Sequence, residues 1–150
     1  MLRDSITQAQ KDAMKAREKE RLAAIRLILA KIKDKDIELR TVEHTGDDDA
    51  LVIDVLQKMA KQRRESISMY EQGGRQDLAG QEKAELAVIE GFLPAQMSED
   101  EVKAAIATIK ADVGAESIKD MGKVMGELKA RHGGEIDMGK AGALVKASFA

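Results

Sequence analysis

Residues 61–94 read KQRRESISMYEQGGRQDLAGQEKAELAVIEGFLP, and this stretch decides the fold. Gly73 and Gly74 interrupt two runs of helix-forming residues and supply a stop and a turn between them. Pro94 ends the second run, because proline disfavours helix in the residue before it. The stretch therefore predicts two antiparallel helices joined by a tight turn. Their apolar stripes are Val52, Val55, Leu56, Met59, Ile67 and Tyr70 on the first helix, and Leu78, Leu86, Ile89 and Leu93 on the second.

Charged residues interrupt both apolar stripes of this hairpin. Arg63 falls on the stripe of the first helix, and Glu82 and Glu85 fall on that of the second. A hairpin centred on Gly74 places position 63 opposite position 85, so Arg63 is expected to pair with Glu85, with Glu82 one turn away. Either this is a structural ion pair that sets the helix register, or the two carboxylates perform acid-base chemistry. We favour the structural pair, because a neighbouring arginine holds a carboxylate in its ionised form.

Two more helices are predicted before this hairpin. Apolar residues spaced by three or four over residues 2–16 describe a peripheral helix with one narrow buried face. Residues 20–38 carry apolar residues around nearly the whole circumference, which is typical of a central helix. The acidic run Asp47-Asp48-Asp49 then precedes the hairpin. We expect it to cap the next helix rather than bind a hard metal ion, because such ions need more converging oxygen ligands.

Three further helices are predicted after Pro94. Ser98 and Glu101 have the spacing of a capping box, and Gly114 ends the helix that follows. Ser117 is expected to cap the next helix, which ends at residues 133–134, and Asp137 to cap the last one. The sequence therefore predicts an all-α protein. It is expected to have an N-terminal four-helix domain over residues 1–94 and a C-terminal three-helix domain over residues 95–150.

The composition narrows the possible functions. There is no cysteine, which excludes disulfides and thiolate chemistry and makes the cytoplasm the expected compartment. No apolar run approaches the roughly 20 residues needed to span a bilayer, so we expect no membrane association. The net charge of −2 lacks the basic excess of a general nucleic-acid binder. We therefore expect no DNA binding and only local basic patches.

The sequence lacks the known catalytic signatures. It has no phosphate-binding glycine-rich loop followed by lysine, no HExxH motif and no nucleophile elbow. Its two histidines, His44 and His132, are each isolated and are expected on the surface. We therefore expect no catalytic residue, no bound metal and no cofactor.

A basic strip interrupted by glycines is the main candidate binding site. In the sixth predicted helix, Lys119, Lys123, Gly126 and Ala130 fall opposite the core face, and Gly122 lies beside them. A glycine within a helix costs about 1 kcal/mol relative to alanine, so a functional reason for these two is plausible. The strip either faces a phosphate backbone or packs closely on another helix, and the sequence does not choose between these readings. Further basic residues expected near it are Lys129, Arg131, Lys140 and Lys146.

Several motifs resemble a known family over nearly the whole chain. KQRRES at residues 61–66, GGRQDLA at residues 73–79, and Leu93-Pro94 resemble the N-terminal pattern of the YqeY family. KDMGKVMG at residues 119–126, with Asp137 and LVK at residues 144–146 after it, resembles the tail domain shared with the GatB subunit of the glutamine-dependent tRNA amidotransferase. The resemblance implies an N-terminal four-helix part followed by a three-helix tail of the GatB/YqeY type.

The basic strip and the resemblance together leave three candidate functions open. The first is a module without its own active site that binds tRNA or associates with a tRNA-modifying or tRNA-charging enzyme. Because the chain has only one tyrosine and two phenylalanines, such a module would contact the sugar-phosphate backbone of a folded RNA rather than stack on its bases. The second is an accessory protein of glutamine-dependent carbon-nitrogen ligation, which would need a partner subunit for catalysis. The third is a protein-protein adaptor with no RNA role.

Overall fold

The computed structural model describes residues 1–43 and 46–150, and the predicted surface position of His44 lies outside them. The described residues form seven α-helices and two short 3-10 helices, with no β-strand, which confirms the predicted all-α class. In chain order the elements are α1 (Leu2–Ala16), α2 (Lys19–Glu38), η1 (Leu39–Thr41), α3 (Asp48–Gln72), α4 (Gln76–Phe92), α5 (Glu99–Val113), η2 (Ile118–Asp120), α6 (Met121–His132) and α7 (Met138–Ser148).

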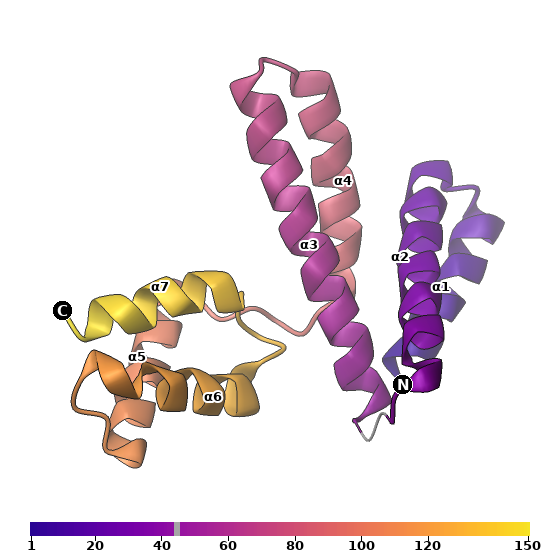
Figure 1. The fold of residues 1–150 in the computed structure, drawn as a ribbon. Coiled ribbons are helices and arrows are strands. Elements are labelled where there is room, and N and C mark those ends of the chain that lie inside the picture. The colour runs from indigo at the N-terminus through magenta and orange to yellow at the C-terminus, as the bar shows by residue number, and fades with distance from the viewer. Residues whose placement is uncertain (44–45) are drawn as a thin grey trace. The chain divides into compact units, whose positions relative to one another are not determined.

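The chain divides into two compact units, Met1–Leu93 and Pro94–Ala150. Unit 1 contains α1 to α4 and unit 2 contains α5 to α7 (Figure 1). Each unit has its own apolar core, so each is described separately below.

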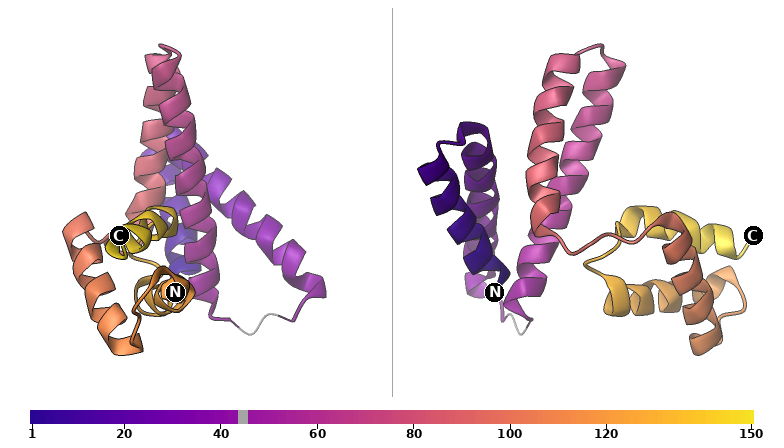
Figure 2. Two further views of the ribbon diagram at one scale, coloured as in Figure 1. Left: turned by 60° about the vertical axis from the view of Figure 1, so that its left-hand side comes forward. Right: turned by 180° about the vertical axis from the view of Figure 1, so that it is seen from behind.

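Unit 1 is built on the long α3/α4 hairpin, against which α1 and α2 pack (Figures 1 and 2). Gly73 ends α3, and Gly74 adopts a left-handed conformation with φ of +73°, as a tight reversal requires. The predicted stop and turn are therefore confirmed. Helix α2 contacts α1, α3 and α4, which fits its predicted central position. The buried core of this unit consists of Ile6, Ala13, Ile25, Ile28, Ile32, Val52, Val55, Leu56, Met59, Ala60 and Ile89.

Within the hairpin, Arg63 lies between two carboxylates of α4. Its Nε atom is 2.9 Å from Glu85 Oε2 and 3.3 Å from Glu82 Oε2. The side chains of Arg63 and Glu82 are 21% and 20% exposed, and the two atoms Arg63 Nε and Glu82 Oε2 are themselves hidden from solvent. Neither of these two atoms makes a hydrogen bond to the described residues. Arg63 Nε and Glu82 Oε2 therefore interact as an ion pair, through their opposite charges.

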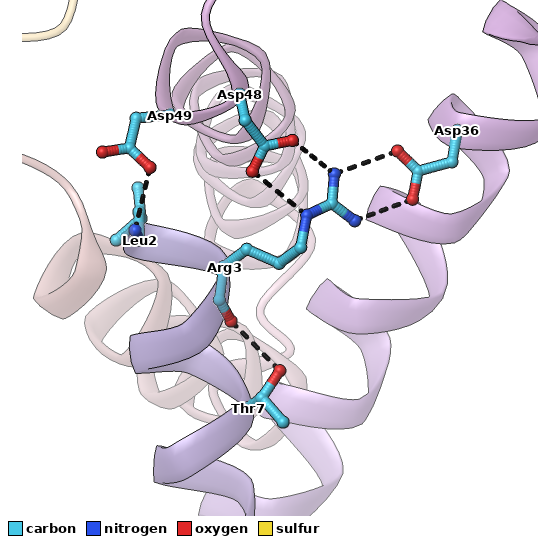
Figure 3. A network of polar contacts seen from close by, with 6 residues as sticks. All are labelled: Leu2, Arg3, Thr7, Asp36, Asp48 and Asp49. Carbon is cyan, nitrogen blue, oxygen red and sulfur yellow. Dashed lines mark hydrogen bonds and ion pairs between the residues drawn. The ribbon is translucent and has the colours of Figure 1, made fainter.

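Arg3 joins three helices of unit 1 (Figure 3). Its Nη1 and Nη2 atoms donate to the two carboxylate oxygens of Asp36 on α2, at 2.7 and 3.0 Å. Its Nε and Nη2 atoms donate to Asp48 on α3, at 3.2 and 2.9 Å. These hydrogen bonds lower the pKa of Asp36 and raise that of Arg3. The start of α1 is thus held against the end of α2 and the start of α3.

The acidic run before α3 does not cap that helix as predicted. Helix α3 begins at Asp48, and its N-cap residue Asp47 makes no side-chain capping bond. The Asp49 carboxylate instead accepts a 2.9 Å hydrogen bond from the backbone N–H of Leu2, one of the amides left free at the start of α1. The capping prediction was wrong because it considered only neighbours along the chain, whereas these carboxylates serve another helix.

Unit 2 is a three-helix module in which α5, α6 and α7 contact one another pairwise. The predicted capping box is confirmed: Ser98 Oγ accepts from the Glu101 amide, and Glu101 Oε1 accepts from the Ser98 amide. Gly114 ends α5 with φ of +66°, and Asp137 caps α7, as expected. The buried core of this unit consists of Val102, Ile106, Ile109, Val124, Leu128, Ile136, Ala141 and Val145.

The Arg3 contacts predict an acid-sensitive contribution to stability. Arg3→Ala should lower the free energy of unfolding by about 1 to 2 kcal/mol at pH 7, because the charged groups are partly screened by solvent. Since folding lowers the pKa of Asp36, this contribution is present above the ordinary aspartate pKa, about 3.9, and is lost as the pH falls through the folded value. Thermal unfolding at pH 7 and pH 3 measures both effects. Lys11→Ala, an exposed change on the same helix, is the control, and equal melting temperatures for the two variants would rule out this role.

The Arg63 contact predicts a second, independent effect. Arg63→Ala should destabilise the protein by about 2 kcal/mol, because it leaves two half-buried carboxylates without their cation. Adding Glu82→Gln and Glu85→Gln to this variant should recover part of the loss, because the stranded charges are then gone. Chemical denaturation measures both changes. Lys61→Ala, at an exposed position of α3, should stay within about 0.5 kcal/mol of the parent, and a similarly small effect for Arg63→Ala would contradict the assignment.

Candidate functional site

Helix α6 and the turn before it carry the predicted basic strip. The sequence placed the start of this helix just after Ser117, but residues Ile118–Asp120 form the 3-10 helix η2 and α6 begins at Met121. Ser117 makes no side-chain capping bond. Instead the Asp120 carboxylate accepts a 3.0 Å hydrogen bond from the Glu116 amide, and this bond lowers the pKa of Asp120. The turn therefore has its own polar contact, and Lys119 lies on η2 rather than on α6.

The glycines of α6 lie on its exposed side. Val124 and Leu128 are fully buried against α5 and α7, whereas Gly122 and Gly126 point about 120–160° away from them around the helix. A Cβ atom added at either glycine would have no described residue within 4 Å. Among the described residues, the glycine face is therefore not packed against another helix. We call the exposed residues Lys119, Gly122, Lys123, Gly126 and Lys129 the α6 strip.

The lysines of the α6 strip are free of carboxylate partners among the described residues. Lys119, Lys123 and Lys129 are exposed and take part in no ion pair or hydrogen bond there. Asp120 lies close enough to Lys123 for the lysine to contribute to the lowered pKa of Asp120. The amide end of α6 adds positive partial charge beside Lys119 and Lys123. These groups give the strip an anion-attracting surface.

Arg131 does not contribute to this surface as the sequence suggested. Its Nε atom donates to Glu127 at 2.7 Å and its Nη1 atom donates to Asp112 of α5 at 2.9 Å. The guanidinium therefore ties α6 to α5. The charge of Arg131 is balanced by two carboxylates. A count of basic residues near the α6 strip therefore overstates the positive charge of the strip.

Lys140 and Lys146 are exposed on α7, at some distance around that helix from each other. Both flank the buried residues Ala141 and Val145, but they project about 120° to either side of that face. The two lysines therefore lie on different sides of α7, and their place beside the α6 strip stays a prediction.

An exposed apolar side chain that the sequence analysis missed lies at the start of the strip. Ile118 is 50% exposed on η2, next to Lys119. The sequence pattern placed Ile118 in the first turn of the sixth helix. Its exposed position follows from the 3-10 helix η2, which the pattern did not predict. It adds a small apolar contact area to an otherwise basic and bare surface.

The other candidate groups for chemistry do not assemble into a reactive site among the described residues. His132 is not isolated as predicted, since its Nδ1 atom lies 3.1 Å from Glu135 Oε2 and the ring is half-buried. Across residues 1–43 and 46–150 no three potential metal-ligating side chains come together. No helix in this part of the chain is long and apolar enough to cross a membrane. The carboxylates beside Arg63 are engaged by that arginine, as described above.

Comparison with curated proteins finds mitochondrial relatives in yeasts. The protein named altered inheritance of mitochondria protein 41, mitochondrial, is 31% identical over 111 residues in Kluyveromyces lactis, covering 73% of this chain and 58% of the relative. The protein of the same name in Vanderwaltozyma polyspora is 36% identical over 83 residues, covering 55% of this chain and 43% of the relative. In Saccharomyces cerevisiae strain YJM789 the identity is 29% over 124 residues, covering 79% of this chain and 65% of the relative. The chain thus spans less than two thirds of each of these relatives.

A family model gives the broader match. The model described as Yqey-like protein aligns with residues 3–149, which include both units, the Arg63 contact and the α6 strip. The motifs of the α3/α4 hairpin and of the η2/α6 segment therefore lie inside one continuous family match. On this evidence the chain belongs to the YqeY-like protein family.

Proposed function

We propose that this protein is a non-catalytic helical module that binds tRNA, or a tRNA-modifying or tRNA-charging enzyme, through the α6 strip. One observation carries the proposal: lysines without carboxylate partners surround two helix glycines whose exposed side is bare. A phosphate group can approach such a backbone closely while the lysines contact it. The likeness of residues 119–126 to the tail domain of GatB, a tRNA amidotransferase subunit, supports the same function.

The low stability of α6 also supports this proposal. Two glycines within a helix of twelve residues weaken it by about 1 kcal/mol each relative to alanine. Neither glycine is required by packing within the described chain, because an added Cβ would meet nothing there. Departures from local helix preference without a structural cause are expected at functional sites.

A protein-protein adaptor is the second candidate, and the exposure of Ile118 favours it. A partner helix could pack on Gly122 and Gly126 while covering Ile118. Such binding would depend little on salt, whereas contact with phosphate weakens steeply as salt rises. The two functions therefore differ in a measurable way.

An accessory role in glutamine-dependent carbon-nitrogen ligation is a separate candidate of another class. In that role a partner subunit supplies the active site, and this chain contributes only binding. Ammonia release from glutamine by the isolated chain would contradict it. The cytoplasm is the proposed compartment, although the yeast relatives are named mitochondrial, and fractionation of the source cells tests this assignment.

The first test is titration of the protein into labelled bulk tRNA at several salt concentrations. We expect binding that weakens with salt, and a Lys119→Ala/Lys123→Ala variant whose logarithmic salt slope is smaller by about 2, because two phosphate contacts are lost. Lys58→Ala/Lys61→Ala removes two charges from α3 and is the matched control. Absence of tRNA binding by the parent at low salt would reject the RNA function and favour the adaptor.

The second test separates stability from binding at one glycine. Gly126→Ala should stabilise unit 2 by about 1 kcal/mol, because alanine favours helix and its methyl group meets no neighbour. The same variant should bind tRNA more weakly, because the methyl group holds the phosphate away. Thermal unfolding and tRNA titration measure the two effects. Gly80→Ala, at an exposed and equally open position of α4, is the control and should leave binding unchanged; unchanged binding by Gly126→Ala would show that nothing approaches this glycine.

A further inference from the structure

Unit 1 carries a second line of unpaired cations, on α2 and η1. Lys19, Arg26, Lys33 and Arg40 follow one another at intervals of seven residues. A seven-residue interval drifts by about 20° around a straight α-helix, so Lys19, Arg26 and Lys33 share a stripe about 40° wide on α2, and Arg40 follows on the 3-10 helix η1. All four are exposed. We call them the α2 strip.

The α2 strip lies away from the core of unit 1. The buried face of α2 is formed by Ala24, Ile25, Ile28 and Ile32. The strip cations make no ion pair and no hydrogen bond to any described residue. This distinguishes them from Arg3 and Lys35, whose charges are paired with carboxylates of the same unit. Structural roles therefore account for other cations near α2 but not for these four.

The carboxylates near the α2 strip lie to either side of it, so they offset its positive charge only weakly. Glu20, Asp34 and Glu38 lie about 80–120° around α2 from Arg26, on the other edge of the exposed surface. Asp36 lies on the opposite flank, where Arg40 contributes to its lowered pKa, but its two oxygens accept hydrogen bonds from Arg3. The strip therefore keeps a net positive edge along its whole length.

The spacing of the cations indicates the kind of partner. Seven helical residues rise about 10.5 Å, so the four charges are spread over roughly 30 Å. One small anion could contact only one of them, whereas a polymer with regularly repeated negative charges could contact all four. Ala23 and Ala30, which lie between the cations and are exposed, leave room for a backbone to lie along the helix. No aromatic side chain lies on α2, so base stacking does not contribute.

From this arrangement we propose that the α2 strip is a contact surface for the phosphate backbone of double-helical RNA. The strip lies on a different unit from the α6 strip, and the inference does not rest on the function proposed above. An anionic membrane fits less well. Helices that lie on membranes need a broad apolar face beside their cations, whereas the exposed large apolar side chains of α2 are Leu27 and Ile37, which lie about 80° apart around the helix and form no such face.

The test uses the full chain carrying Lys119→Ala and Lys123→Ala, so that the α6 strip cannot account for the result. A labelled RNA duplex of 20 base pairs is titrated at several salt concentrations. Adding Arg26→Glu and Lys33→Glu should reduce the logarithmic salt slope by at least about 2, with a corresponding loss of affinity at low salt. Lys31→Glu/Lys58→Glu makes the same charge change on the far edge of α2 and on α3, and is the matched control.

Each outcome decides for or against the α2 strip. Loss of duplex binding in the Arg26/Lys33 variant and its retention in the control support the inference. Absence of duplex binding before these changes, or equal loss in both variants, overturns it. Binding to phosphatidylserine vesicles but not to the duplex also overturns it, in favour of a membrane surface. If circular dichroism shows that the Arg26/Lys33 variant is unfolded, Lys19→Gln/Arg40→Gln at the ends of the strip replaces it, with the same outcomes.

Discussion

Each unit of this protein has to be held together by aliphatic side chains, and this constraint shapes the rest of the structure. Aromatic residues make up 2% of the chain, and the two cores consist of isoleucine, valine, leucine, alanine and methionine. Aromatic side chains bury the most area per residue, and here they contribute at the margins, where Phe92 packs against the core of unit 1 and Phe149 against that of unit 2. Helices with narrow aliphatic stripes can also slide or rotate against one another. Polar contacts at a few defined points then determine how the helices align.

The charged residues accordingly divide into two groups. Arg3, Arg63 and Arg131 each contact two carboxylates, and each connects at least two helices. The cations of the α2 and α6 strips have no such partners among the described residues. Net charge hides this division, because paired and unpaired cations count equally in it. The α6 strip also contains two glycines that weaken its helix, and this combination is the basis of the proposed binding role.

The match to the YqeY-like family model runs over residues 3–149 and so includes both the helical hairpin of unit 1 and the three-helix unit 2. The Arg63 contact and the α6 strip both lie within the matched range. Their physical requirements differ, however. The hairpin positions are explained by packing and charge neutralisation within the chain, whereas the described residues give no packing reason for Gly122 and Gly126.

The sequence by itself determined the helices and most of their ends, because apolar periodicity, capping residues and glycine stops act over a few neighbouring positions. The same local rules, with the turn at Gly74, were enough to bring Arg63 opposite Glu85. Only the tertiary structure decided that Arg3 contacts Asp36 and Asp48, which are 33 and 45 residues away, because that contact requires three helices to be packed first. It also decided which lysines remain unpaired and which glycines stay uncovered, because both depend on the side chains that neighbouring helices place beside them.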